Sequence, residues 1–292
     1  MNHFHIESKL LHQWQRHAKL SFPALCQARL AESHKGTYGT VAILGGQAGM
    51  SGAIILAGSA ALNSGCGKVW LGFKQADIPL AVIANQPELM LNTAEHLLTR
   101  QDVTTWVMGC GLGTDSTAQR LLTQCLQKSP SPILLDADAL NILAQQPHLI
   151  THQQPSCLVL TPHPGEAARL LHCSIAEIQS NRHQAVSRLA EQFAAWVVLK
   201  GNHSLIASPS GQIRQNQSGN PGLATAGSGD VLSGIIGSLL AQHIPPEQAV
   251  NGGVWLHGLA AEILALNQIG PIGLCAHEIV AAVRWLRNRL TD

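Results

Sequence analysis

The stretch Asn220–Ala241, "NPGLATAGSGDVLSGIIGSLLA", places five glycines around a single acid, Asp230, and then continues as an apolar run. After the acid, apolar residues recur at helical spacing, while the opposite stripe consists of glycines and serines that permit close packing on a neighbour. We therefore predict a buried helix over 227–241 with Asp230 in its first turn.

The beginning of this predicted helix is suited to bind an anion. The first N–H groups of a helix have no intrahelical acceptor, and the helix dipole is positive at that end. Gly227 and Gly229 carry no Cβ, so a phosphoryl group can approach the backbone. Asp230 would repel phosphate, but its carboxylate can accept the proton of a hydroxyl that attacks phosphorus. The alternative is that Asp230 only stabilises the helix dipole, by about 0.3–1 kcal/mol.

The rest of the chain predicts an α/β fold with a central, mainly parallel sheet flanked by helices on both faces. Continuous apolar segments predict strands at 40–46, 68–73, 105–110, 132–139, 157–163 and 196–201, and a hairpin is expected over 203–216. Helical patterns occur at 53–64, 117–126, 247–266 and 276–290. Residues 1–34 are expected to be a lead-in with a helix around "ALCQARLAESH" (24–34), and 35–292 one domain.

Five of the predicted strands end in polar or glycine-rich segments. Parallel strands present functional residues at their carboxyl ends, and here those ends read "GGQAGMSG", "GCGLGTD", "DADALN", "TPHPGE" and "KGNHS". Ordinary turns would explain two of the five segments. We therefore expect one ligand site at this edge of the sheet, with His163 held between two prolines and Lys200 at a strand end.

Composition limits the function classes. The 292 residues are 46% apolar and 12% charged with a net charge of +1, which predicts a sizeable core and no nucleic-acid partner. We see no signal peptide and no uninterrupted apolar stretch of about 18 residues, so we expect no membrane partner. Seven cysteines without a CxxC pair predict reduced thiols and a cytoplasmic location. The "HFH" at His3 and His5 lacks zinc-site spacing.

Two glycine-rich segments resemble nucleotide motifs only in part. "GCGLG" (109–113) lacks the acid that a dinucleotide-binding fold would place after its second strand, and "GGQAGMSG" (45–52) lacks the Lys-Ser/Thr ending of a P-loop. The second segment is better interpreted as a backbone loop that touches substrate. "TPHPGE" has a structural alternative as well, namely a turn with Glu166 in the first turn of a helix.

Taken in order, "HKGTYG", "GMSGA", "GCGLG", "DADALN", "TPHPGE", "LKG" and "SGNPGLATAGSGDVLSG" resemble the NAD(P)H-hydrate dehydratases of the ribokinase-like superfamily. The resemblance extends from about His34 to the final helices. It implies repair of NADH or NADPH whose reduced nicotinamide ring has taken up water. A nucleotide phosphorylates the hydroxyl of the S epimer, and phosphate then leaves to restore the ring. Bacterial members typically use ADP and release AMP; eukaryotic members use ATP.

The resemblance also implies residue roles. Asp230 would activate the hydrate hydroxyl, Gly227, Ser228 and Gly229 would form the anion hole, and Ala53, Gly113 and His163 would line the hydrate pocket. The nucleotide would contact a segment and one glycine: Lys200, Gly201, Asn202, His203, Ser204 and Gly229. Mg²⁺ would bridge the phosphates, with no ligands named. The resemblance further implies a homotetramer and a separate epimerase, because the lead-in is too short to be an epimerase domain.

Three departures and two alternatives stay open. Compared with the family pattern, Ser204 replaces threonine, Ala226 replaces a common glycine, and His203 is bulkier than expected. The bulk of His203 leaves open whether the phosphoryl donor is ADP or ATP. The preference for NADH hydrate or NADPH hydrate as substrate is likewise open. The alternatives are a ribokinase-like kinase of a small alcohol or vitamin precursor, disfavoured by "TPHPGE" and "DADALN", and a non-catalytic nucleotide sensor, disfavoured by Asp230.

Overall fold

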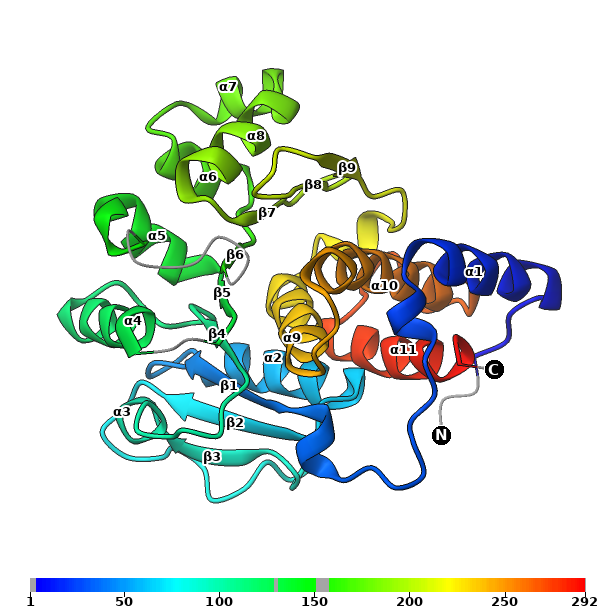
Figure 1. Ribbon diagram of the computed structural model, residues 1–292, viewed down its shortest axis with the longest axis horizontal. Helices are drawn as coiled ribbons and strands as arrows, with labels where there is room; N and C mark the ends of the chain where they lie inside the picture. The colour runs from blue at the N-terminus through cyan, green and yellow to red at the C-terminus, as the bar shows by residue number, and fades with distance from the viewer. Residues whose placement is uncertain (1–3, 129–130, 151–157, 292) are drawn as a thin grey trace.

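The computed structural model describes residues 4–128, 131–150 and 158–291. Within them, nine strands form one sheet in the order β3-β2-β1-β4-β5-β6-β7-β8-β9 (Figure 1). The strands from β3 to β7 are parallel, whereas β8 and β9 are antiparallel and close the sheet as a hairpin. Their bounds are β1 Thr40–Gly45, β2 Lys68–Phe73, β3 Met90–Thr93, β4 Thr105–Met108, β5 Ile133–Leu135, β6 Leu158–Leu160, β7 Trp196–Leu199, β8 Leu205–Ala207 and β9 Ile213–Gln215.

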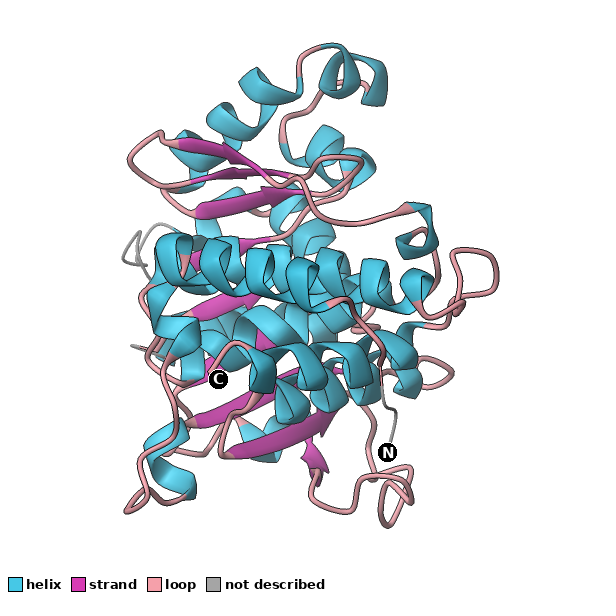
Figure 2. Cartoon of the chain, turned by 90° about the vertical axis from the view of Figure 1, so that its right-hand side faces the viewer, coloured by secondary structure: helices cyan, strands magenta, loops and turns pink. Residues whose placement is uncertain are grey.

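Helices cover both faces of this sheet, as the sequence predicts (Figures 1 and 2). One face carries α2 Ser51–Ser64, α9 Ser228–Ala241, α10 Pro246–Leu266 and α11 Ala276–Arg289, with α1 Ser8–Ser21 outside α10. The other carries α3 Ala94–Leu97, α4 Ser116–Lys128, α5 Ala137–Gln145, α6 Pro164–Leu170, α7 Ile175–Ser180 and α8 Arg182–Phe193. In β1, Val41 and Ile43 belong to the first core, while Ala42 and Leu44 belong to the second. Burial on both faces explains why the strands are continuously apolar.

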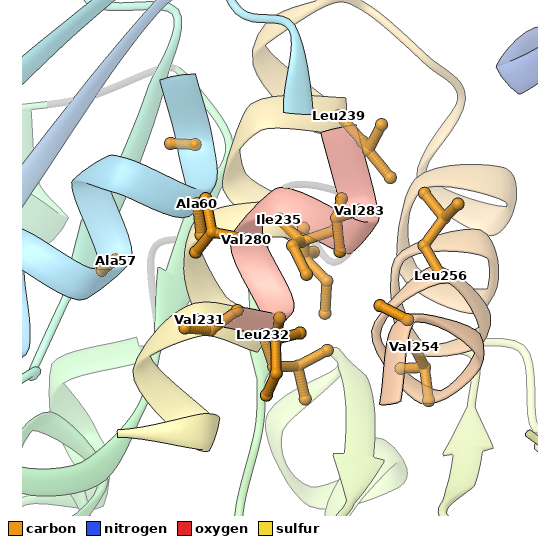
Figure 3. Packing of buried hydrophobic residues seen from close by; sticks show 14 of the residues in the cluster. Ala57, Ala60, Val231, Leu232, Ile235, Leu239, Val254, Leu256, Val280 and Val283 are labelled. Carbon is orange, nitrogen blue, oxygen red and sulfur yellow. The ribbon is translucent and has the colours of Figure 1, made fainter. Parts of the chain in front are cut away.

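The helix α9 lies at the centre of the first core, between α2, α10 and α11 (Figure 3). Its glycines set the spacing: a Cβ built on Gly234 would lie 2.0 Å from the backbone oxygen of Ala57 in α2. Val231, Ile235 and Leu239, all fully buried, fill the space toward the other helices. This packing fixes where the first turn of α9 sits relative to the sheet.

The predicted position of the helix within the first 34 residues is wrong. The helix covers Ser8–Ser21, and within 24–34 only the short 3-10 turn Pro23–Cys26 is regular. Ala18, Phe22 and Leu25 are buried in the first core, so this part of the chain packs on the domain. After Leu25 most of the segment is exposed, Leu30 to 73%, so it buries too little apolar surface to stabilise a helix.

By length and composition, α10 could cross a membrane, but 83% of its most apolar window is buried inside the protein. The protein core surrounds it, so we treat it as a core helix.

Candidate active site

The five polar strand ends lie side by side. β1, β4, β5, β6 and β7 are consecutive, parallel neighbours, so their carboxyl ends meet at one edge of the sheet. The first turn of α9 reaches the same edge, since a Cβ on Gly229 would lie 3.4 Å from Lys200 Nζ and 3.7 Å from Asp136 Oδ2. The structure therefore brings the predicted anion-binding helix onto the predicted edge.

The N-terminus of α9 is open. Gly227 is the N-cap with φ +85°, and no side chain caps the helix. A Cβ at Gly227 would lie 2.4 Å from Leu56 Cδ1, so both the backbone conformation and the space require glycine. The first intrahelical bond runs from Val231 N–H to the Gly227 carbonyl (3.0 Å), so helix geometry gives the N–H groups of Gly229 and Asp230 no intrahelical acceptor. These two groups are available to an anion.

The Ser228 hydroxyl is buried and already has a partner. Its Oγ lies 3.2 Å from Nε2 of His257 of α10, which is also buried, and the Ser228 N–H donates to the Thr225 carbonyl at 3.4 Å. Burial lowers the pKa of His257 to about 4, so the imidazole is neutral. Within the predicted anion hole, the glycine backbone and not the Ser228 hydroxyl is presented to a ligand.

Lys200 is the cation of the site, and its position is fixed by a carboxylate. Lys200 Nζ lies 2.7 Å from Asp136 Oδ1, and Ser233 Oγ of α9 donates to Asp136 Oδ2 at 2.7 Å. Asp136 is only 2% exposed. Burial opposes the charge of Lys200, but the carboxylates of Asp136 and Glu166 outweigh it and raise the pKa of Lys200. The result is a fixed ammonium group next to Gly229.

Asp230 lies in an environment suited to a base. Burial, opposed by a hydrogen bond from the Cys110 thiol and reinforced by the charge of Asp136, raises the pKa of Asp230 to about 6. The carboxylate is thus ionised at neutral pH but holds a proton more readily than a free aspartate. Such a pKa suits a group that takes a proton during the reaction.

His163 fulfils the structural alternative and remains available to a ligand. It is the N-cap of α6. The Nδ1 atom of His163 accepts from Gly165 N–H at 2.9 Å, and the backbone N–H of His163 donates to Glu166 Oε2 at 2.8 Å. His163 Nε2 lies 3.3 Å from Glu166 Oε1, and half of the imidazole is exposed. Burial, with the Asp136 charge adding, raises the pKa of Glu166 to about 7. Burial, together with the charges of Lys200 and Arg169, lowers the pKa of His163, so His163 is a rigidly held, neutral side chain at the edge of the site.

The other two predicted hydrate contacts lie on neighbouring loops. Gly113 N–H donates to Asp138 Oδ2 at 2.7 Å, and Ala53, in the first turn of α2, lies beside Gly111, whose Cβ would be 3.2 Å from Ala53 Cβ. A groove of about 870 Å³ continues from here, lined by Thr114, Asp138, Gly165 and Arg169 among others. The groove does not include Gly113 or His163 themselves, but it begins at Thr114 and Gly165, one and two residues after them in the chain.

Sequence reasoning missed the residue that shapes the predicted nucleotide loop. Arg182 of α8 donates to the Asn202 carbonyl at 2.5 Å and to the Leu199 carbonyl at 3.2 Å. Ser204 Oγ donates to the Gly201 carbonyl at 3.1 Å, and His203 adopts φ +51°. No motif contains Arg182, and only its position in the fold shows that it holds this loop.

The described residues contain no group of three or more His, Cys, Asp or Glu side chains that could hold a metal. Asp136 is occupied by Lys200 and Ser233, which leaves Asp230 and Asp138 as carboxylates near the anion site. This set fits a Mg²⁺ ion carried mainly by nucleotide phosphates and water, and not one caged by protein.

A protein-family model described as NAD(P)H-hydrate dehydratase matches residues 41–284. The chain is 52% identical over 291 residues to the ADP-dependent (S)-NAD(P)H-hydrate dehydratase of Neisseria meningitidis, covering 99% of this chain and 98% of that protein. Among solved structures, the ADP/ATP-dependent NAD(P)H-hydrate dehydratase of Bacillus subtilis, co-crystallised with ATP and Mg²⁺, superposes with a TM-score of 0.82 at 33% identity, covering 94% and 97% of the chains. A ribokinase-like superfamily protein of Enterococcus faecalis gives a TM-score of 0.78 at 30% identity over 91% and 93%.

Proposed function

Because the chain belongs to the NAD(P)H-hydrate dehydratase family, we propose that it catalyses the ADP-dependent dehydration of the S epimer of hydrated NADH or NADPH, restoring the reduced cofactor. The observation that carries this proposal is the open N-terminus of α9, with Asp230 and Lys200 beside it. An anion site next to a basic carboxylate suits transfer of a phosphoryl group to an alcohol.

In the first step, the hydroxyl oxygen of the hydrate attacks the β-phosphorus of ADP, and Asp230 accepts the proton of that hydroxyl. The bond from that phosphorus to the bridging oxygen breaks, and AMP leaves with the electron pair. The N–H groups of Gly229 and Asp230 and the ammonium of Lys200 stabilise the negative charge on the transferring group.

In the second step, the electron pair of the ring nitrogen expels the phosphate, and the neighbouring ring carbon loses a proton to form the double bond. Phosphate is a far better leaving group than hydroxide, which is why phosphorylation must come first. His163, held by its capping bonds, and Gly113 would orient the ring. The sum of the two steps is hydrate and ADP to NAD(P)H, AMP and phosphate.

Mg²⁺ would supply charge neutralisation on the nucleotide phosphates. Its closest protein contact would be Asp230 or Asp138, the two carboxylates left without a cation near the anion site.

Recovery of nicotinamide absorbance tests the proposal. Purified protein is mixed with hydrated NADPH, Mg²⁺ and either ADP or ATP, with the Asp230→Asn variant as the matched control. We expect recovery with ADP and none with the variant, while the variant still binds nucleotide. Folded wild-type protein that binds nucleotide but restores no absorbance with either donor would favour the small-alcohol kinase instead.

Three properties extend the proposal. We propose that a separate epimerase supplies the S epimer from the other hydrate. The six described cysteines are free thiols, which supports a reducing, cytoplasmic location. We also propose a homotetramer, on the family resemblance alone, which sedimentation would test.

A further inference from the structure

A second polar groove lies at the opposite end of α2 and α9 from the candidate active site. It has a volume of about 850 Å³, and five of its lining residues define what we call the arginine groove: Arg29, Ser64, Gln86, Arg284 and Arg287. Ser64 is the last residue of α2, whereas Ala53 lies in its first turn. A helix of 14 residues is about 20 Å long, so the two sites are separate.

Buried polar atoms without partners concentrate in this groove. The described residues contain six buried side-chain nitrogen or oxygen atoms that make no hydrogen bond, and three of them belong to the arginine groove: Ser64 Oγ, Gln86 Oε1 and Arg287 Nε. Ser64 is 1% exposed. A buried polar group left without a partner costs about 1–3 kcal/mol. All three belong to side chains that line one groove, so a polar ligand bound there would have unpaired groups within reach of small side-chain movements.

The charge of the groove is positive. Three arginines line it against one acid, Glu88. Arg29 donates to the Gly65 carbonyl, and Arg287 donates to the Leu25 carbonyl. Among the described residues, neither guanidinium forms an ion pair with a carboxylate.

The two guanidinium groups are fixed in place before any ligand arrives. Arg29 lies over the ring of Tyr38, with 4.0 Å from its Cζ to the ring centroid. Burial, with the Arg29 charge adding, lowers the pKa of Arg287 to about 10, so the group remains a cation at neutral pH. Arg287 is half-buried and, within the described part of the chain, faces no anion, which carries a desolvation cost that an anionic ligand would reduce.

We propose that the arginine groove binds a small organic phosphate. Arg29, Arg287 Nε and the Ser64 hydroxyl are three separate donors, and they match the several oxygens of a phosphate better than the two of a carboxylate. The volume leaves room for an organic part, whose hydroxyl or amine would donate to Gln86 Oε1. This proposal does not rest on the proposed function, because its readout is binding at a distant groove.

Titration calorimetry with inorganic pyrophosphate tests the groove. Ser64→Ala removes no hydrogen bond from the folded protein, and we expect it to weaken binding about three-fold or more; Arg29→Gln should weaken it about ten-fold. Lys200→Met, which removes the cation of the other site, should leave the binding affinity of the groove unchanged.

Four results would overturn the proposal. In the first, the wild type does not bind pyrophosphate. In the second, neither Ser64→Ala nor Arg29→Gln changes the affinity. In the third, binding is lost only in Lys200→Met. In the fourth, sedimentation would show that Ser64→Ala dissociates an oligomer while pyrophosphate still binds normally, so that the groove is an interface between copies.

Discussion

Replacing Asp230 by asparagine should abolish turnover and at the same time make the protein more stable. The carboxylate is partly buried, and burial raises its pKa from 3.8 to about 6. The charged form is therefore disfavoured in the folded state, and the difference corresponds to about 3 kcal/mol at neutral pH. An asparagine carries no charge, and its amide oxygen can still accept the hydrogen bond from Cys110.

The pH dependence identifies the cause. Because the folded pKa lies above the unfolded one, the penalty is complete above about pH 7, falls as the pH drops through 6 toward 4, and vanishes only below about pH 3, where both states of the wild type are protonated. Urea unfolding should show the variant about 3 kcal/mol more stable at pH 8, with the advantage about halved at pH 5. Asp77→Asn, at an exposed position, serves as control and should change little. A variant that is no more stable at pH 8, or whose advantage does not change with pH, would refute this reasoning.

Three further predictions concern the surroundings of the site. Lys200→Met should destabilise the fold by about 3 kcal/mol, because the buried Asp136 loses its cation. Adding Asp136→Asn to this variant should restore most of the lost stability in thermal unfolding, and no restoration would contradict the pairing of Lys200 with Asp136. Gly234→Ala should destabilise by about 3 kcal/mol, since its Cβ would lie 2.0 Å from a carbonyl of α2, whereas Gly52→Ala has no atom within 4 Å and should be tolerated in the same unfolding assay. His163→Ala should raise the dissociation constant for the hydrate more than that for the nucleotide; equal losses would remove His163 from the hydrate pocket.

The fold was predictable because the apolar pattern of each strand reflects whether one or both of its faces are buried. Residues such as Val41, Ala42, Ile43 and Leu44 face two cores, so an uninterrupted apolar run indicates a parallel sheet covered on both faces. The first 34 residues were not predictable in the same way. Their ordering depends on the contact that α1 makes with α10, and local sequence carries no signal for that contact.

The candidate site was predictable where backbone chemistry leaves a local signature. Gly227 and Asp230 can be identified from sequence because a helix start that must stay open excludes side chains. The partners that fix the site come from far along the chain: Ser233 and Lys200 meet at Asp136, 97 and 64 residues away respectively. Such meetings depend on the order of strands in the sheet, which no single segment encodes.

The fate of one oxygen atom tests the central claim most directly. If Asp230 activates the hydrate hydroxyl for attack on phosphorus, that oxygen leaves the ring as part of phosphate. Hydrated NADPH labelled with ¹⁸O in its hydroxyl is incubated with the enzyme, ADP and Mg²⁺, and the products are analysed by mass spectrometry. We predict that the label appears in inorganic phosphate; label released as water would contradict a phosphorylated intermediate.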